Sequence, residues 1–142
     1  MPKSLKTLSR IQKFRIDEQR KLLVEKQTEE ETIVNNIKQI ELRYKEEKAF
    51  VQENPNIGDF GIYTKRYLEI RQEQEDRLAL VRIQIEKIRD TISEMFKEQK
   101  TFDIIDRERE KAKRREFEQK EQKLLDEVGT NAYIKKHDDD NT

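Results

Sequence analysis

Helix-breaking residues are confined to one short interior stretch of the chain and to its two end regions. Both prolines and all three glycines fall at residue 2, within residues 54–61, or at residue 129. Proline removes a backbone hydrogen-bond donor and glycine tolerates a positive φ, so the sequence Asn-Pro-Asn-Ile-Gly-Asp-Phe-Gly at 54–61 favours a turn. This interruption separates two long segments of high helix propensity.

Apolar residues recur at helical spacing in both segments. The second segment keeps an alternating three- and four-residue spacing through Leu78, Val81, Ile85, Ile88, Ile92, Met95 and, after Gln99, Phe102. The first segment has the same spacing through Ile33, Ile37, Ile40 and Tyr44. Only 32% of the residues are apolar and 44% are charged, which suits the narrow apolar stripe of a coiled coil better than a wide globular core. The sequence therefore predicts an all-α fold, a long antiparallel two-helix coiled-coil hairpin.

The boundaries of this hairpin follow from capping residues and breakers. Ser4 can cap the first helix, which we expect over residues 4–52, and the turn then covers residues 53–61. The second helix is expected over residues 62–128, with Gly129 as its C-terminal cap. Residues 129–142 are expected to form a flexible tail, and the whole chain of 1–142 a single coiled-coil domain.

Folding the chain about residue 57 brings each residue i near residue 114 − i, which predicts the pairing across the hairpin. Ile37 should then meet Leu78, Ile33 should meet Val81, and Leu22 should meet Ile92. The beginning of the first helix is ambiguous, because its apolar residues belong to neighbouring registers. Leu8, Ile11 and Leu22 fit one register, and Ile16 and Leu23 fit another. No apolar residue occurs between Glu25 and Thr32, so we expect a soft region there.

The second helix is longer than the first, and the same pairing leaves its residues beyond about 111 without a partner. Phe117, Leu124 and Val128 make a short apolar stripe on this overhanging part, and Glu116 with Lys120 forms an i,i+4 pair that supports an isolated helix. An apolar stripe without a partner predicts a docking surface.

Charge is unevenly placed even though 31 basic residues balance 31 acidic ones. Residues 1–26 carry a net charge of +5 and residues 107–123 a net charge of +3, and antiparallel pairing places both at one end of the hairpin. This basic end favours an acidic partner, with nucleic acid as a second reading. A mixed-sign solvated surface is the plainer alternative, because acids are interleaved and aromatic stacking groups are scarce there.

Several classes of function are not supported by the sequence. The chain has no Cys, one His and no glycine-rich phosphate loop, so we expect no catalytic, cofactor or metal site and no enzyme activity. His137 precedes three Asp residues, but we interpret this stretch as a solvated terminus. Apolar runs are far shorter than the ~20 residues that span a bilayer.

Aromatic residues gather at the start of the second helix. Tyr63 and Tyr67, with Leu68 and Ile70, offer more apolar surface than one coiled-coil seam requires. Packing against Phe50 and Val51 is the favoured interpretation, and contact with a partner is the alternative.

Three short stretches resemble the FliJ family of flagellar export proteins, particularly its alphaproteobacterial form. Residues 14–21 (Phe-Arg-Ile-Asp-Glu-Gln-Arg-Lys) are similar to a Phe-x-(Val/Ile)-Asp-Glu-x-(Arg/Lys)-Arg stretch of that family. Its turn carries Asp or Asn with Pro and an aromatic before Tyr-x-Lys, as residues 54–65 do here. Its Gln-x-x-x-Asp-Glu signature is matched by residues 122–127.

The resemblance implies a non-catalytic stalk or adaptor of the flagellar type III protein export apparatus. Such a subunit inserts into the export ATPase ring and contacts the membrane export gate protein, with export chaperones as a further candidate partner class. The implied location is cytoplasmic, peripheral to the inner membrane at the flagellar base. No small-molecule ligand, cofactor or nucleic acid is expected. A generic coiled-coil adaptor, an injectisome stalk and a nucleic-acid-binding rod stay open as alternatives.

The candidate partner-contact residues come from the matching stretches, the aromatic residues and the overhanging helix. They are Phe14, Asp17, Glu18, Arg20, Tyr63, Tyr67, Arg114, Arg115, Phe117, Gln122, Leu125, Asp126 and Glu127.

Overall fold

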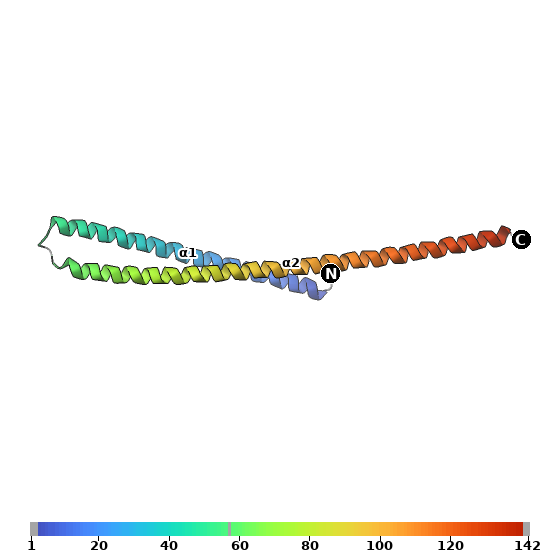
Figure 1. Cartoon of the computed structure of the whole chain (residues 1–142), viewed down its shortest axis with the longest axis horizontal. Coiled ribbons are helices and arrows are strands. Elements are labelled where there is room, and N and C mark those ends of the chain that lie inside the picture. The colour runs from blue at the N-terminus through green and yellow to red at the C-terminus, as the bar shows by residue number, and fades with distance from the viewer. Residues whose placement is uncertain (1–2, 57, 141–142) are drawn as a thin grey trace. The chain divides into compact units, whose positions relative to one another are not determined.

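The computed structural model describes residues 3–56 and 58–140, and these residues form two long α-helices joined by a turn (Figure 1). Helix α1 comprises Lys3–Glu53 and helix α2 comprises Phe60–Asp140. The two helices pack against each other and the described residues contain no strand, which confirms the all-α helical hairpin. Their composition accounts for this, because straight-chain charged residues lose little side-chain freedom in a helix.

The turn is built by the breakers that the sequence places there. The backbone N–H of Asn54 donates to the carbonyl of Phe50 over 3.0 Å, and the Asn54 side-chain amide donates to the same oxygen, which closes the end of α1. Gly58 has a φ of 60°, a conformation that side chains with a Cβ adopt at a cost. The Asp59 carboxylate accepts a hydrogen bond of 2.9 Å from the N–H of Gly61, so Asp59 is the N-cap of α2.

Helix α2 differs from its expected bounds at both ends. It begins at Phe60 rather than Ile62, because Asp59 supplies the cap, and it continues to Asp140 rather than ending near Val128. Gly129 therefore lies inside the helix, and residues 129–140 of the expected flexible tail are helical. One glycine costs a helix only about 1 kcal/mol, so it does not by itself end one. Residues 141–142 lie outside the described part of the chain.

The structure divides into two compact units where the sequence analysis expects a single domain. Unit 2 comprises Gln12–Phe96, and unit 1 comprises Met1–Ile11 with Lys97–Thr142. Each unit contains parts of both helices.

The core of unit 2 is a narrow apolar seam between α1 and α2. Its centre is a cluster of Ile33, Leu78, Val81 and Ile85, with Leu23, Val34 and Ile37 packed against it. Ile33 is only 2% exposed. Ile33 and Ile37 thus pack in the same cluster as Leu78 and Val81, as the pairing rule predicts.

The register of α1 in unit 2 is the one that includes Ile16 and Leu23. Ile16 is buried and Leu23 is half-buried, whereas Leu22 is exposed rather than packed opposite Ile92 as expected. The alternating spacing that leads back from Ile33 reaches Leu23 and Ile16, and it also passes through polar residues. The pairing of the well-defined apolar cluster therefore sets the register of the weaker part of the helix.

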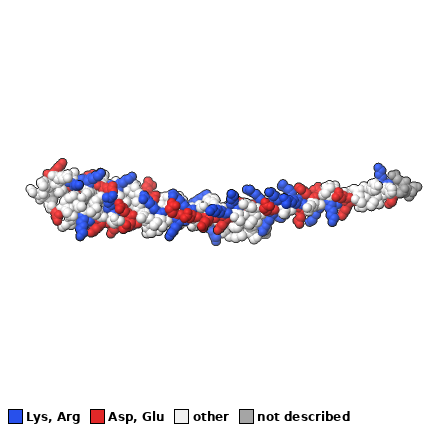
Figure 2. Space-filling model, viewed as in Figure 1, with Lys and Arg blue, Asp and Glu red and all other residues white. Residues whose placement is uncertain are grey.

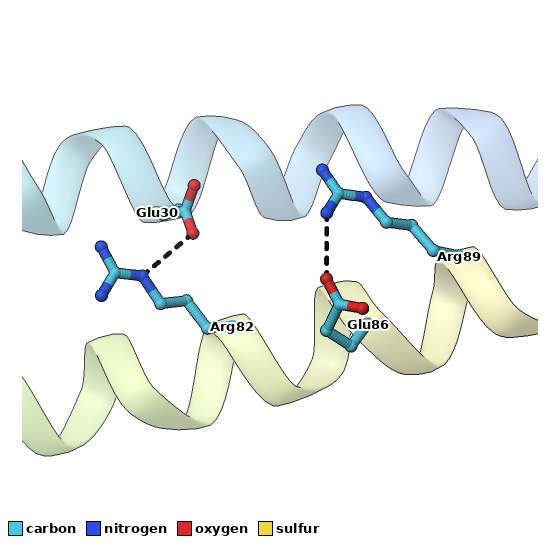
Figure 3. A network of polar contacts seen from close by, with 4 residues as sticks. All are labelled: Glu30, Arg82, Glu86 and Arg89. Atoms are coloured by element: carbon cyan, nitrogen blue, oxygen red, sulfur yellow. Dashed lines mark hydrogen bonds and ion pairs between the residues drawn. The ribbon is translucent and has the colours of Figure 1, made fainter.

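Polar contacts accompany the seam where apolar residues are missing from α1. Glu30 accepts a hydrogen bond of 3.3 Å from the Arg82 Nε across the two helices, as Figure 3 shows. The Lys26 Nζ lies 3.2 Å from Glu29 on the same helix. These charges replace the apolar layers that residues 25–32 do not provide.

Unit 1 contains a shorter stretch of helix pairing. Leu5 is buried, and the Gln99 side-chain amide donates a buried hydrogen bond of 2.7 Å to the Ser9 hydroxyl. Phe102 and Asp106 are half-buried, but every side chain from residue 107 to residue 138 is exposed. We call residues 107–138 the free segment of α2, because they have no helix packed against them within unit 1.

Candidate partner-binding surfaces

The candidate residues at 14–20 lie on an exposed face of α1 in unit 2. Phe14 is 65% exposed, because it lies between the buried residues Gln12 and Ile16 and points away from the seam. The Asp17 carboxylate lies 3.6 Å from the Arg20 guanidinium. Such exposed pairs contribute at most about 1 kcal/mol, so these groups are available to a partner at little cost.

Arg20 also has a structural contact that its position in the sequence does not reveal. Its Cζ atom lies 5.1 Å from the centroid of the Phe96 ring on α2. A cation–π contact of this kind contributes about 0.5 to 1 kcal/mol at an exposed site. Arg20 therefore contributes to the contact between the two helices in unit 2.

The aromatic residues near the turn form a stack that joins the two helices. We call Tyr44, Phe60, Tyr63 and Tyr67 the aromatic cluster. The Tyr44 and Tyr67 rings are 4.0 Å apart and nearly parallel, and Tyr44 also stacks with Phe60 at 5.6 Å. The Tyr44 hydroxyl lies within hydrogen-bonding distance, 3.2 Å, of the Thr64 hydroxyl.

Tyr67 therefore packs on Tyr44, and the expected packing on Phe50 and Val51 stays a prediction. Phe50 is 50% exposed. Tyr44 continues the apolar spacing of α1, which predicts that it faces α2, and its ring stacks there on Tyr67. This stack was not predicted from the sequence, where Tyr44 appears only as the last residue in the three- and four-residue spacing of the first helix.

A groove of about 550 Å³ runs along one flank of the aromatic cluster in unit 2. The groove is lined by Asn36, Gln39, Ile40, Arg43, Tyr63, Arg66, Tyr67, Ile70 and Gln74. Its walls include apolar faces of Ile40, Tyr63 and Ile70, and two guanidinium groups, those of Arg43 and Arg66, lie along it. An apolar channel with two cations is complementary to an amphipathic segment that carries acidic residues.

Ion pairs lie on the opposite flank of the same seam, beside the aromatic cluster. The Arg71 guanidinium lies 3.0 Å from Glu41 on α1 and 3.2 Å from Glu75 on α2. The nearby Tyr67 phenol and then Glu41 raise the pKa of Arg71, so this group stays cationic. Glu41 follows the seam residue Ile40 whereas Arg43 precedes the seam residue Tyr44, which places them on opposite flanks. The groove therefore lies on the flank that the Arg71–Glu41 ion pair does not cross.

The candidates on α2 between residues 114 and 127 all lie on the free segment in unit 1. Arg114 and Arg115 are exposed, Phe117 is 67% exposed and Leu125 is 59% exposed. The Gln122 amide donates to Asp126 over 3.1 Å within the helix. The free segment thus offers apolar side chains that no other described element covers.

Two further features complete the description of possible sites. Among the residues that the structure describes, no group of His, Cys, Asp or Glu is arranged to hold a metal ion. The His137 ring stacks with that of Tyr133 at a centroid distance of 6.1 Å. Over the same described residues, neither helix has a stretch apolar enough to cross a bilayer.

Comparison with known proteins places the chain in a family. The family model described as flagellar FliJ protein matches residues 2–138. No curated protein sequence and no solved structure matches the chain significantly. The matched range includes α1, the turn, α2 up to residue 138 and the surfaces described above. The protein therefore belongs to the FliJ family and is a component of flagellar protein export.

Proposed function

We propose that this protein is a non-catalytic stalk that binds the flagellar export ATPase ring and the membrane export gate protein. The observation that carries this proposal is the free segment, a single helix that exposes large apolar side chains. Phe117, Leu124, Leu125 and Val128 are 67%, 61%, 59% and 58% exposed. The protein would work in the cytoplasm, at the inner face of the membrane beneath the flagellum.

The free segment suits the central channel of a ring. A single α-helix with its side chains is about 10–12 Å across, which is narrow enough for such a channel. Phe117, Leu124 and Val128 repeat at spacings of seven and four residues, so they form one stripe along the helix. Burying each of these side chains against the wall of the channel contributes roughly 1.5 to 3 kcal/mol before ordering costs are subtracted.

The groove in unit 2 suits a different kind of partner, an extended or helical segment of the export gate protein. Its apolar lining supplies the affinity, and Arg43 with Arg66 selects a segment that carries acidic residues. Among the described contacts, the ion pairs between α1 and α2 do not cross the flank with the groove. A partner that binds in the groove therefore does not have to break an ion pair between the helices. Export chaperones are a further candidate occupant of the groove.

The ATPase contact is tested by measuring ATP hydrolysis by the cognate export ATPase with and without the full chain. We expect the full chain to raise the rate and to hydrolyse no ATP alone. The triple variant Phe117→Ala, Leu124→Ala, Val128→Ala should require at least about tenfold more protein for the same effect, because the three contacts of the stripe are truncated.

The matched control is Leu80→Ala with Ile83→Ala, which removes two equally exposed apolar side chains from α2 in unit 2. This control should stimulate the ATPase normally. Absence of stimulation by the wild-type chain, or equal losses in both variants, would reject the free segment as the ATPase contact.

The gate contact is tested by calorimetry with the cytoplasmic part of the export gate protein. Tyr63→Ala with Arg43→Gln alters the two sides of the groove and should weaken binding about tenfold or more. The Leu80→Ala, Ile83→Ala chain again serves as control. If the groove variant binds the gate as tightly as the wild type, the gate docks elsewhere.

A further inference from the structure

A row of basic side chains runs along α2 in unit 1, at spacings of three and four residues. We call Lys97, Lys100, Arg107, Lys111 and Arg114 the basic stripe, and Ile104 occupies the position between Lys100 and Arg107. At 100° per residue these six positions fall within a sector of about 100° on one face of the helix. The Lys97-to-Arg114 span is roughly 25 Å along the helix axis.

The basic stripe faces away from the packed side of the helix. Gln99 is buried and Phe102 and Asp106 are half-buried, so these positions define the side of α2 that meets α1. All five cations are exposed, and Ile104 is 49% exposed. Figure 2 shows blue side chains gathered along this part of α2. The stripe is therefore presented to the surroundings along its whole length.

Acidic residues border the basic stripe on both sides. Asp103 and Glu110 lie along one edge, and Glu108 lies along the other, where its carboxylate is 3.9 Å from the Lys111 Nζ. A partner that wraps around the helix would meet these carboxylates as well as the cations. A flat anionic surface would touch only the stripe, and the acids would stay in water.

We propose that the basic stripe rests on a bilayer surface that contains anionic phospholipids. A bilayer is flat on the scale of one helix, and its headgroups move laterally to meet cations at any spacing. Each basic residue held near an anionic leaflet strengthens binding about fivefold. Ile104, in the middle of the stripe, reaches the boundary between the headgroups and the acyl chains. This contact is independent of the free segment's apolar stripe and of the groove.

Nucleic acid fits the basic stripe and its neighbours less well than an anionic bilayer does. A helix in the major groove is flanked by phosphates on both sides, which would bring Asp103 and Glu108 against like charge. Single-stranded binding uses aromatic side chains for stacking, and the basic stripe contains none. Neither phosphates nor sugars provide an environment for Ile104.

The test is flotation of the full chain with vesicles of phosphatidylcholine alone and of phosphatidylcholine mixed equally with phosphatidylglycerol. We expect binding only to the anionic vesicles, with affinity falling as salt is raised. Lys100→Gln, Arg107→Gln, Lys111→Gln should weaken binding about 100-fold, since three contributions of about fivefold are lost.

The matched control removes three cations from the other side of the same helix. Arg109→Gln, Lys113→Gln, Lys120→Gln changes the net charge equally, but these positions lie outside the basic stripe and on its far side. This variant should bind anionic vesicles nearly as well as the wild type. Equal losses in the two variants would overturn the proposal, because net charge and not the face of the helix would then govern binding.

The role of Ile104 can be followed by fluorescence, because the chain contains no Trp. Ile104→Trp should shift its emission to the blue when anionic vesicles are added, whereas Ile83→Trp, on an exposed face in unit 2, should not shift. No shift at residue 104, or tighter binding to duplex DNA than to the vesicles at the same salt, would also overturn the proposal. Lys97→Gln with Lys100→Gln, which lie outside the free segment, should weaken vesicle binding about 25-fold and still stimulate the export ATPase, so a failure here is separable from a failure of the stalk proposal.

Discussion

Leu22 and Leu23 are adjacent in the sequence but have different environments in unit 2. Leu23 packs against the cluster of Ile33 and Val81, whereas Leu22 is on the exposed flank. We expect Leu23→Ala to lower the free energy of unfolding by about 2 kcal/mol, because it leaves a cavity at the seam. Leu22→Ala should cost less than about 1 kcal/mol. Urea unfolding followed by circular dichroism measures both, and a larger loss for Leu22→Ala would mean that α1 uses the other register.

Ile88 and Glu86 provide a second comparison on α2. Ile88 is 8% exposed, and Glu86 is on the surface with an ion pair of 3.0 Å to Arg89 (Figure 3). Ile88→Asp places a carboxylate in the seam and should lower stability by roughly 3 to 5 kcal/mol. Glu86→Lys loses only an exposed pair and should change stability by no more than about 1 kcal/mol. Similar thermal shifts in the two variants would contradict this arrangement of the helix.

At the scale of the elements, the turn depends on Gly58 and Asp59. Gly58→Ala places a Cβ on a residue with φ of 60° and should destabilise the hairpin by about 1 kcal/mol. No atom lies within 4 Å of that Cβ, so the expected cost is conformational and not steric. Asp59→Ala removes the N-cap of α2 and should cost a similar amount. An unchanged midpoint in thermal unfolding of both variants would show that the turn does not limit the stability of the hairpin.

Substitution of Gly129 should stabilise the protein, in contrast to substitution of Gly58. It lies within α2 and an added Cβ would meet nothing within 4 Å. Gly129→Ala should therefore stabilise this part of α2 by about 0.5 to 1 kcal/mol. Hydrogen exchange read by mass spectrometry should slow for the amides around residue 129. Faster exchange there would mean that α2 ends near Val128, as the sequence pattern alone indicates.

At the scale of the whole molecule, stability should be distributed unevenly along the chain. Residues 12–96 contain the apolar cluster, whereas residues 107–138 have no helix packed on them in unit 1. Long isolated helices are marginally stable in water, so amides in the free segment should exchange much faster than those around Ile33 and Ile85. Adding the export ATPase should slow exchange in the free segment. Uniform protection along α2 in the protein alone would contradict this picture.

The candidate surfaces were partly predictable from the sequence. The apolar stripe of Phe117, Leu124 and Val128 follows from helical spacing alone, because its three residues lie on one helix. The groove could not be predicted, because its walls come from residues such as Arg43 and Ile70 that are distant in the sequence. The contact of Arg20 with Phe96 was missed for the same reason: it depends on the register between the helices.

The sequence by itself determined that the chain forms two helices and where it turns, because propensity, periodicity and the clustered Pro and Gly residues are local properties. It also determined which face of α2 packs, since the spacing from Leu78 to Phe102 is regular. The tertiary structure decided the register of α1 and the continuation of α2 past Gly129. It also decided which flank of the seam carries the groove beside the aromatic cluster. These features depend on free-energy differences between alternatives that one helix cannot distinguish alone, and packing against the second helix resolves them.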